Sequence, residues 1–91
     1  MAHLSKHNDA LLARVRRISG QMSAIERALT TGDDCATTLH LVAGARGAIN
    51  GLMAEILEEH VREHVAHPGL TDVDRQAGAD ELMEAIRRYG K

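Results

Sequence analysis

The sequence has 91 residues, which is enough for one domain and leaves no room for a second. Apolar residues make up 44% of it and charged residues 26%, a globular balance that excludes a disordered chain and a membrane-spanning protein. The formal charge of −2 gives no support for a nucleic-acid partner, so only the distribution of the charged residues can indicate one.

The apolar residues are those that helices prefer. The sequence contains no Phe, no Trp and a single Tyr, and its apolar residues are otherwise mainly Leu, Ile, Val, Met and Ala. Strands favour aromatic and β-branched residues, whereas Ala, Leu, Met, Glu and Arg favour helices. We therefore predict an all-α fold for a single domain of residues 1–91.

A first helix is predicted over about residues 5–30. Its apolar residues alternate at spacings of four and three, the spacing of a heptad seam: Leu11, Val15, Ile18, Met22, Ile25 and Leu29. Ser5 is the expected N-cap, and Gly32, in the polar segment that follows, is the expected stop.

A second helix is predicted from Cys35 to about Ala66, where a His-Pro-Gly sequence ends the pattern. It carries one apolar seam and further apolar residues beside that seam: Leu39, Val42, Ile49, Met53, Ile56 and His60 on it, and Leu41, Leu52, Leu57 and Val61 beside it. Gly44, Gly47 and Gly51 lie inside this helix, where each costs about 1 kcal/mol relative to alanine. We expect them to let another helix backbone approach closely, with a kink as the alternative.

A third, shorter helix is predicted from about Thr71, with one apolar face: Leu82, Met83, Ile86 and Tyr89. The expected architecture is a long antiparallel helical hairpin plus this short helix. The second helix would be about 48 Å long, which is longer than a compact domain of this size is wide. Its apolar faces would stay exposed unless other copies cover them. A single cysteine cannot stabilise the chain by an internal disulfide. For both reasons we expect a homo-oligomer.

Nothing in the sequence indicates export or a membrane. No long apolar run follows a basic start at the N-terminus, and no stretch approaches the roughly 20 apolar residues of a membrane span. A lone free thiol fits a reducing compartment. We expect a soluble cytoplasmic protein with no membrane partner.

Three histidines are predicted to converge at the open end of the hairpin. His60 and His64 are four apart in a helix and project from one face, a spacing at which two imidazoles can bind one metal ion. In an antiparallel hairpin turning near Gly32, His3 falls beside them. His67 extends the cluster by one turn. The alternatives are surface histidines that happen to be four apart and a His67 that is simply solvated.

Cys35 lies 25 residues before His60 on the same helix, or about 38 Å away, so it cannot join the histidines within one chain. In an antiparallel dimer of the long helix, Cys35 of one subunit reaches the histidines of the other. The prediction is a shared site of one subunit's His3, His60 and His64 with the partner's Cys35, which couples metal binding to the arrangement of the subunits. The alternative for Cys35 is a small core residue near a helix start.

The types of ligand select among metals. One thiolate with three imidazoles accepts Zn(II), Co(II) or Ni(II), whereas Cu(I) favours two thiolates. After removal of Met1, the amine of Ala2 and a backbone amide lie beside the His3 imidazole, and Glu63 is near. This supply of N and O donors allows six-coordination, which favours Ni(II) or Co(II) over tetrahedral Zn(II).

Basic residues cluster on the first helix, and a fourth arginine lies opposite them in the hairpin: Arg14, Arg16, Arg17 and Arg46. Arg14 and Arg17 share a face that the seam leaves exposed. In an oligomer this patch would repeat by symmetry and could follow a DNA backbone through phosphate contacts. The alternative is a solvated basic face paired with acids such as Glu26, and no conventional helix-turn-helix is apparent.

Two motifs and three single residues resemble the CsoR/RcnR family: residues 14–21 (RVRRISGQ) and 45–55 (ARGAINGLMAE), with Cys35, His60 and His64. The resemblance covers nearly the whole chain. It implies a small all-helical bacterial repressor, assembled as a dimer of dimers into a disc-shaped tetramer. Such repressors bind operator DNA without a conventional reading helix and release it when a metal or another inducer binds.

Within that family the inducer follows four positions, which are His3, Cys35, His60 and His64 in this sequence. The combination resembles the nickel- and cobalt-responsive RcnR branch. The copper branch usually has a second cysteine at the last position. The formaldehyde branch usually has proline at position 2, where this chain has Ala2, and often has glutamate at the last position.

The same resemblance bears on three other residues. Arg14 and Arg17 match positions that contact DNA, and Arg46 is a further candidate. Asp34 stands where the nickel/cobalt branch often has glutamate, so it is a possible additional ligand with a shorter reach.

The sequence therefore favours a metal-responsive repressor that binds operator DNA in the apo form and is released by Ni(II) or Co(II) at an intersubunit site, with Zn(II) also open. One alternative is a repressor of the same family that senses formaldehyde through Ala2 and Cys35. Another is a metal-storage or chaperone protein with no DNA role. An enzyme is not expected, because the sequence has no paired nucleophile and base and no phosphate-binding loop.

Overall fold

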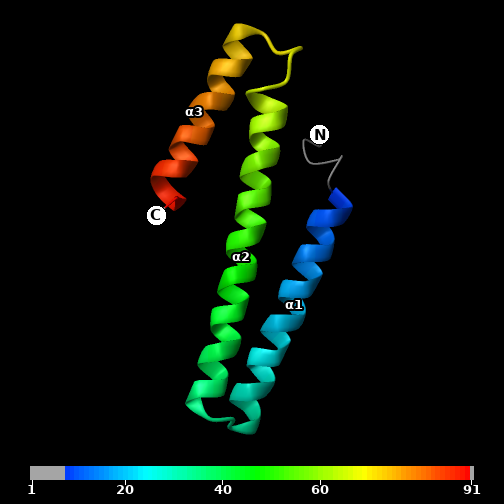
Figure 1. Cartoon of the computed structure of the whole chain (residues 1–91), viewed down its shortest axis with the longest axis vertical. Coiled ribbons are helices and arrows are strands. Elements are labelled where there is room, and N and C mark those ends of the chain that lie inside the picture. Colours follow the sequence, from blue (N-terminus) through cyan, green and yellow to red (C-terminus); the bar gives the residue numbers. More distant parts are fainter. Residues whose placement is uncertain (1–7, 91) are drawn as a thin grey trace. The chain divides into compact units, whose positions relative to one another are not determined.

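The computed structural model describes residues 8–90, and in that range it contains three helices and no strand (Figure 1). They are α1 (Asn8–Thr31), α2 (Cys35–His64) and α3 (Asp72–Tyr89). The all-α prediction is confirmed, and α2 ends two residues earlier than expected. The expected N-cap Ser5 lies outside the described residues. Over the described range, no helix has an apolar stretch long enough to cross a membrane.

The chain divides into two compact units, and the division falls inside α2. Among the described residues, α1 and the part of α2 up to Ala54 form the first, which we call the hairpin unit. The rest of α2, from Glu55, belongs with α3 to the second, which we call the α3 unit. The single domain expected from the length of the chain stays a prediction.

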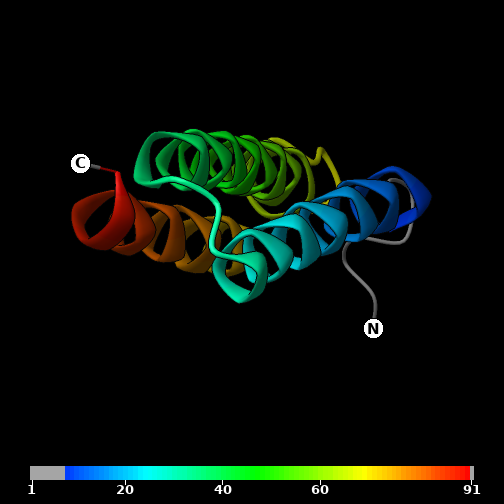
Figure 2. The same cartoon turned by 90° about the horizontal axis from the view of Figure 1, so that it is seen from below.

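A short turn joins α1 to α2, and it is built as the sequence predicts. Gly32 has a φ of 77°, the left-handed conformation that favours glycine at the end of a helix. The N–H of Asp33 donates to the carbonyl of Ala28 at 2.9 Å, which closes α1. Asp34 then caps α2, because its Oδ1 accepts the N–H of Thr37 at 2.8 Å. Figure 2 shows this turn from the end of the hairpin.

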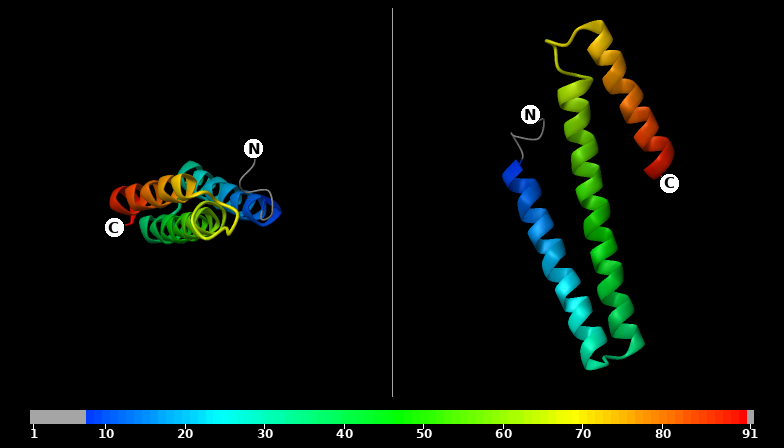
Figure 3. Two further views of the ribbon diagram at one scale, coloured as in Figure 1. Left: turned by 90° about the horizontal axis from the view of Figure 1, so that it is seen from above. Right: turned by 180° about the vertical axis from the view of Figure 1, so that it is seen from behind.

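The two helices of the hairpin unit run antiparallel (Figure 3, right). A Cβ built on Gly44 would lie 3.8 Å from Nε2 of Gln21, and a Cβ built on Gly51 would lie 2.8 Å from Nη1 of Arg14. A turn centred on Gly32 predicts positions 43 and 50 opposite these two α1 residues. The antiparallel hairpin is therefore confirmed, and these contacts lie close to the expected pairing.

The side of α2 that faces α1 can be read from its less exposed residues. In the hairpin unit these residues recur at spacings of three and four: Thr38, Leu41, Ala45, Ala48 and Leu52. Ala45 is buried among them, as are Leu11 and Ala28 of α1. This packing side lies beside the predicted seam of α2 and not on it.

Most residues of the two predicted seams are exposed in the single chain. The large exposed apolar side chains of the hairpin unit include, on α1, Val15, Met22 and Leu29, and on α2, Leu39, Val42, Ile49 and Met53. Their exposed fractions range from 36% at Met53 to 69% at Leu29. Apolar area of this kind is stabilising only when something covers it. The observation agrees with the expectation that the hairpin exposes apolar faces along its length.

The glycines inside α2 do not serve a close approach of helices within this chain. A Cβ on Gly47 would meet nothing within 4 Å, and one on Gly44 would make only an ordinary contact with the side chain of Gln21. At Gly51 the neighbour is the side chain of Arg14 and not a helix backbone. No helix backbone of the described chain approaches these glycines, so the expectation stays a prediction for a helix of another copy. α2 is one continuous helix.

Close approach of two helix backbones occurs in the α3 unit, at Gly78. A Cβ built on Gly78 would lie 2.8 Å from the carbonyl carbon and 2.9 Å from the Cβ of His64, and closer still to the carbonyl oxygen. Gly78 is buried. The absence of a side chain at this position is what lets α3 pack directly against the end of α2.

Polar contacts fix the connection between α2 and α3. The Thr71 side chain caps α3 by accepting the N–H of Asp74 at 3.1 Å. The guanidinium of Arg75 donates to three carbonyls of the connecting segment: those of Val65, His67 (3.2 Å) and Leu70 (3.4 Å). One α3 side chain thus holds the whole connection in place.

Candidate functional site

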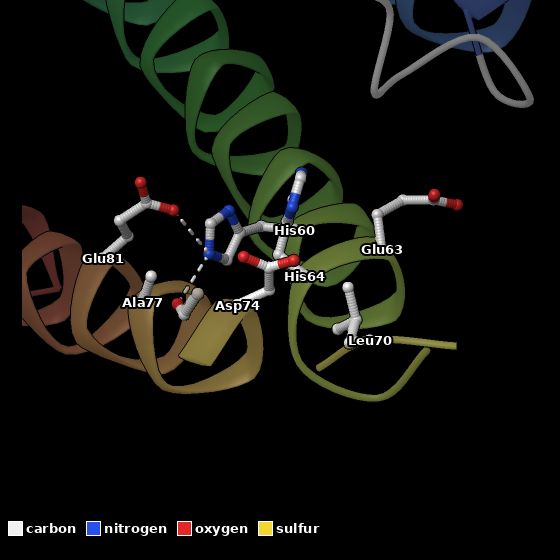
Figure 4. A pocket seen from close by; sticks show the side chains of 8 residues that line it. His60, Glu63, His64, Leu70, Asp74, Ala77 and Glu81 are labelled. Atoms are coloured by element: carbon white, nitrogen blue, oxygen red, sulfur yellow. Dashed lines mark hydrogen bonds and ion pairs between the residues drawn. The ribbon is translucent and has the colours of Figure 1, made fainter. Parts of the chain in front are cut away.

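The i, i+4 pair of histidines is placed as predicted. The rings of His60 and His64 have centroids 5.0 Å apart and are tilted by 38° (Figure 4). Both belong to the last turns of α2 and to the α3 unit. Two imidazoles therefore project from one helix face, which is the arrangement that binding of one metal ion by both would need.

The tautomer of His60 follows from its contacts with α3. Its Nε2 lies 2.8 Å from the carbonyl oxygen of Gly78, and the Oε1 of Glu81 is 3.7 Å away (Figure 4). Because a carbonyl oxygen can only accept, Nε2 carries the hydrogen and donates it. In neutral His60 the lone pair is then on Nδ1, which makes Nδ1 the atom that can bind a metal.

A hollow opens beside the two histidines within the α3 unit. Its lining combines two imidazoles, three carboxylates and small or apolar residues: His60, His64, Glu63, Asp74, Glu81, Leu70, Ala77 and Gly78 (Figure 4). Imidazole nitrogens and carboxylate oxygens are donors that divalent first-row metals accept. The sequence analysis missed Asp74 and Glu81, since both lie on α3 and no spacing along the chain connects them to the histidines.

The described residues contain no group of three or more His, Cys, Asp or Glu that is arranged to hold a metal ion. Glu63 lines the hollow, but Figure 4 shows its carboxylate directed away from His60. His60 and His64 thus lie together, and no third described donor is grouped with them. Ala2 and His3, the predicted N-terminal ligands, lie outside the described residues.

Cys35 and Asp34 belong to the hairpin unit, at the start of α2. The Cys35 thiol is free and exposed, so the alternative of a buried core cysteine is not met. Asp34 is engaged as a helix cap, and the hydrogen bonds from the Thr37 side chain and backbone lower the pKa of Asp34 below its usual value. The carboxylate proposed as an additional ligand therefore already has a structural role.

His67 lies apart from the pair of histidines. Its Nδ1 accepts the N–H of Gly69 at 3.0 Å, and its carbonyl accepts from Arg75. The side chain is exposed and does not line the hollow. In the described chain it shapes the connection between α2 and α3 and does not extend the histidine cluster.

The predicted basic residues differ in their surroundings. Arg14 is half-buried against α2, whereas Arg16 and Arg17 are exposed on α1. Arg46 is also exposed, and it follows Leu39 by seven residues, so it shares the side of the exposed seam of α2. The structure thus brings the Arg14 guanidinium against α2, while Arg16, Arg17 and Arg46 are exposed.

Comparison with known proteins gives a consistent family. The family model described as "metal-sensitive transcriptional repressor" matches residues 7–88. The chain is 48% identical over 91 residues to an uncharacterized protein in the bioA 5′ region of Serratia marcescens. It is 34% identical over 91 residues to a transcriptional repressor RcnR homolog of Escherichia coli O139:H28. Each of these two alignments covers 100% of this chain and 100% of the relative.

A solved structure is also similar to this chain. It is the formaldehyde-responsive regulator FrmR from Salmonella enterica serovar Typhimurium, in a variant that has histidine in place of a glutamate. The TM-score is 0.86 at 39% sequence identity, with 92% of this chain and 94% of that chain covered. The all-helical fold derived from the sequence is therefore also the fold of this relative.

Proposed function

The chain belongs to the family of metal-sensitive transcriptional repressors, the CsoR/RcnR family, and we propose that it binds operator DNA in its metal-free form and releases the DNA when Ni(II) or Co(II) binds. Members of this family are transcriptional repressors and not enzymes. A bacterial repressor meets its operator in the cytoplasm, so that is where we place the action of this protein.

The observation that carries the proposal is a pair of imidazoles that the described residues leave without a further ligand. His60 and His64 lie together, and Nδ1 of His60 is available to a metal, but no third described ligand joins them in a metal-binding group. We assign the missing ligands to the N-terminal segment, with Ala2 and His3, and to Cys35 of the partner subunit. A metal bound this way would tie the subunits together.

The exposed seam supports the partner's contribution. At about 100° per residue, Cys35, the seam residues and His60 fall on one side of a continuous helix. Two α2 helices that cover each other's seams in antiparallel order would bring Cys35 of the partner subunit to His60. The seam residues on both helices are exposed in the single chain and available for such contact. We propose that two of these dimers assemble into a tetramer.

The donor set supports Ni(II) or Co(II) over Zn(II). One thiolate, imidazoles, an amine and a backbone amide offer enough donors for six ligands. The carboxylates of Glu63 and Asp34 are possible additional ligands. Because the ligands would come from two subunits, the metal would bind one arrangement of subunits better than another. Such a difference in affinity is what a ligand needs in order to shift an equilibrium.

DNA binding is assigned to the arginines of the hairpin unit. Arg14, Arg16 and Arg17 lie on one helix, and Arg46 is added as a further candidate. Repeated by the symmetry of an oligomer, these guanidinium groups would contact phosphates and position the protein on a duplex. Replacing Arg14 or Arg17 by alanine should weaken binding and reduce its dependence on salt, whereas an unchanged salt slope would exclude the residue as a phosphate contact.

The test combines a metal titration with DNA release. Reduced protein is titrated anaerobically with Co(II) and followed by visible absorption. Sulfur-to-cobalt charge transfer with weak d–d bands would support a six-coordinate site containing Cys35, and intense d–d bands would favour a tetrahedral zinc site. Cys35→Ala should keep apo DNA binding and lose release by metal. A variant that still responds fully would contradict the shared site.

The DNA used in this test is the duplex directly upstream of the protein's own reading frame, with a scrambled duplex of equal composition as control. Saturable binding to the first and not to the second supports a repressor. If neither duplex binds in a saturable way while metal does bind, a storage or chaperone protein is the better reading.

Formaldehyde is a second candidate inducer, and two observations favour it. The Cys35 thiol is exposed and free, and a solved relative with 39% identity is formaldehyde-responsive. In this case the carbonyl carbon of formaldehyde would join the amine of Ala2 to the thiol of Cys35 as a methylene bridge, with loss of one water. Intact mass would rise by one carbon atom per bridge, and Cys35→Ala would abolish the increase. No increase after exposure would remove this candidate.

A further inference from the structure

The guanidinium of Arg14 lies in space that the missing side chain of Gly51 leaves open. A Cβ built on Gly51 would lie 2.8 Å from Nη1 and 3.7 Å from Cζ of Arg14, and no other atom would come within 4 Å apart from the helix's own backbone and the flanking residues. A contact below 3.0 Å forces one of the two groups to move. Any side chain at position 51 would therefore displace this guanidinium.

The contact is specific to Gly51 among the glycines of the hairpin helices. A Cβ on Gly20 or Gly47 would meet nothing within 4 Å, and one on Gly44 would make only an ordinary contact at 3.8 Å. Arg14 is half-buried, whereas its neighbours Arg16 and Arg17 are exposed. One arginine of the basic cluster is thus held against α2, and the rest extend into solvent.

Glycine in the interior of a helix is a cost that alanine would reduce. At Gly51 the only thing that an alanine would meet is the far end of the Arg14 side chain. The fold itself gives no reason for glycine at this position, since the helix backbone and the other helix both leave room for a Cβ. The glycine affects the position of the Arg14 guanidinium.

We propose that Gly51 is a positioning residue for Arg14, which seats the guanidinium against the α2 backbone and so fixes the direction in which it meets a DNA phosphate. The inference rests on the proposed function, because it takes Arg14 as a phosphate contact. A guanidinium that is already placed loses less freedom when it binds, so its hydrogen bonds contribute more to affinity.

The test is Gly51→Ala, measured by fluorescence anisotropy on the labelled upstream duplex over a range of salt. We expect the affinity to fall about three- to tenfold, less than for loss of one charge-assisted hydrogen bond because the guanidinium is displaced and not removed, while the thermal stability is equal or higher. Gly47→Ala is the matched control, since it makes the same change one turn earlier where no atom is met. It should leave the affinity within about twofold.

A double-mutant cycle separates positioning from a general structural effect. In an Arg14→Ala background, Gly51→Ala should cause no further loss of affinity, because the side chain through which it acts is gone. Equal losses in both backgrounds, or an unchanged affinity and salt slope for Gly51→Ala alone, would overturn the inference. If Gly51→Ala unfolds the protein, Arg14→Ala must restore folding, and a failure to do so would also overturn it.

The cycle also distinguishes a failure of the positioning role of Gly51 from a failure of the proposed function. If Arg14→Ala alone leaves binding to the upstream duplex unchanged, Arg14 is not a phosphate contact and both ideas fall together. If Arg14→Ala weakens binding and Gly51→Ala does not, the DNA-binding role stands and only the positioning role is lost.

Discussion

The hairpin unit and the α3 unit are built on different kinds of contact. In the hairpin unit most large apolar side chains of the two seams are exposed, and the buried apolar residues are Leu11, Ala28 and Ala45. In the α3 unit directional contacts position α3 against the end of α2. They include the Nε2 of His60 on the carbonyl of Gly78 and the guanidinium of Arg75 on the connecting segment.

This difference separates two tasks. A surface with a long apolar seam gains stability from a second copy, and its stability should therefore depend on protein concentration. A packed junction with one glycine and a few hydrogen bonds depends on the position of individual atoms. The first suits a surface for assembly, and the second suits the support of two imidazoles at fixed positions.

The largest effect is expected from a charge in the exposed seam. Ile49→Lys places an ammonium where we propose that two copies cover each other, and each dimer would contain it twice. We expect the dissociation constant of the dimer to rise by at least about a hundredfold, because apolar burial is lost and a charge is buried. Sedimentation velocity over a concentration series measures this. His40→Lys, on the side of α2 away from the seam, is the control, and an unchanged assembly of Ile49→Lys would contradict the role of the seam.

The next effect is expected at the closest approach in the α3 unit. Gly78→Ala should lower the free energy of unfolding by about 2 kcal/mol, because the added methyl meets the backbone of His64, which cannot move away locally. Gly20→Ala on α1 has open space around it and should raise stability by up to about 1 kcal/mol. Denaturant unfolding at one protein concentration compares the two. If both variants had a similarly raised free energy of unfolding, α3 would not pack on α2 as described.

A smaller effect is expected from the connection between α2 and α3. Arg75→Lys keeps the charge but loses the forked geometry that reaches the carbonyls of Val65, His67 and Leu70. We expect a loss of about 1 kcal/mol in unfolding free energy and faster amide exchange confined to the α3 unit. Arg87→Lys, an exposed partner of Glu84, is the control and should change little. Uniform exchange across the chain would contradict a local role.

The smallest effect is expected from the cap of α2. Hydrogen bonds from Thr37 lower the pKa of Asp34 in the folded protein. The cap therefore stabilises the protein above the unfolded value of 3.8, and this stability is lost as the pH falls through the lower folded value. Asp34→Ala should lower the Tm by a few degrees at pH 7 and by less at pH 3. Glu26→Gln serves as control, and a loss that is equal at both pH values would exclude the carboxylate as its source.

Several features of the site could be predicted because they are local. The pairing of His60 with His64 needs only the helix period, and the place of Cys35 at a helix start follows from the polar stop before it. The two carboxylates of α3 that line the hollow, Asp74 and Glu81, could not be predicted. They reach the histidines only after the chain has reversed direction, and the register of α3 on α2 is fixed by one small residue.

The sequence alone determined the three helices and, to within a few residues, where α1 ends and α2 begins and ends, since apolar spacing, Gly32 and the His-Pro-Gly segment act locally. Only the tertiary structure decided which glycine serves a close approach. The three glycines of α2 form the more conspicuous pattern, but Gly78 is the one against which a helix backbone packs. It likewise decided that Gly51 makes room for Arg14. The physical reason is that contacts between helices depend on the register of surfaces far apart in the sequence, which the spacing of residues within one helix does not fix.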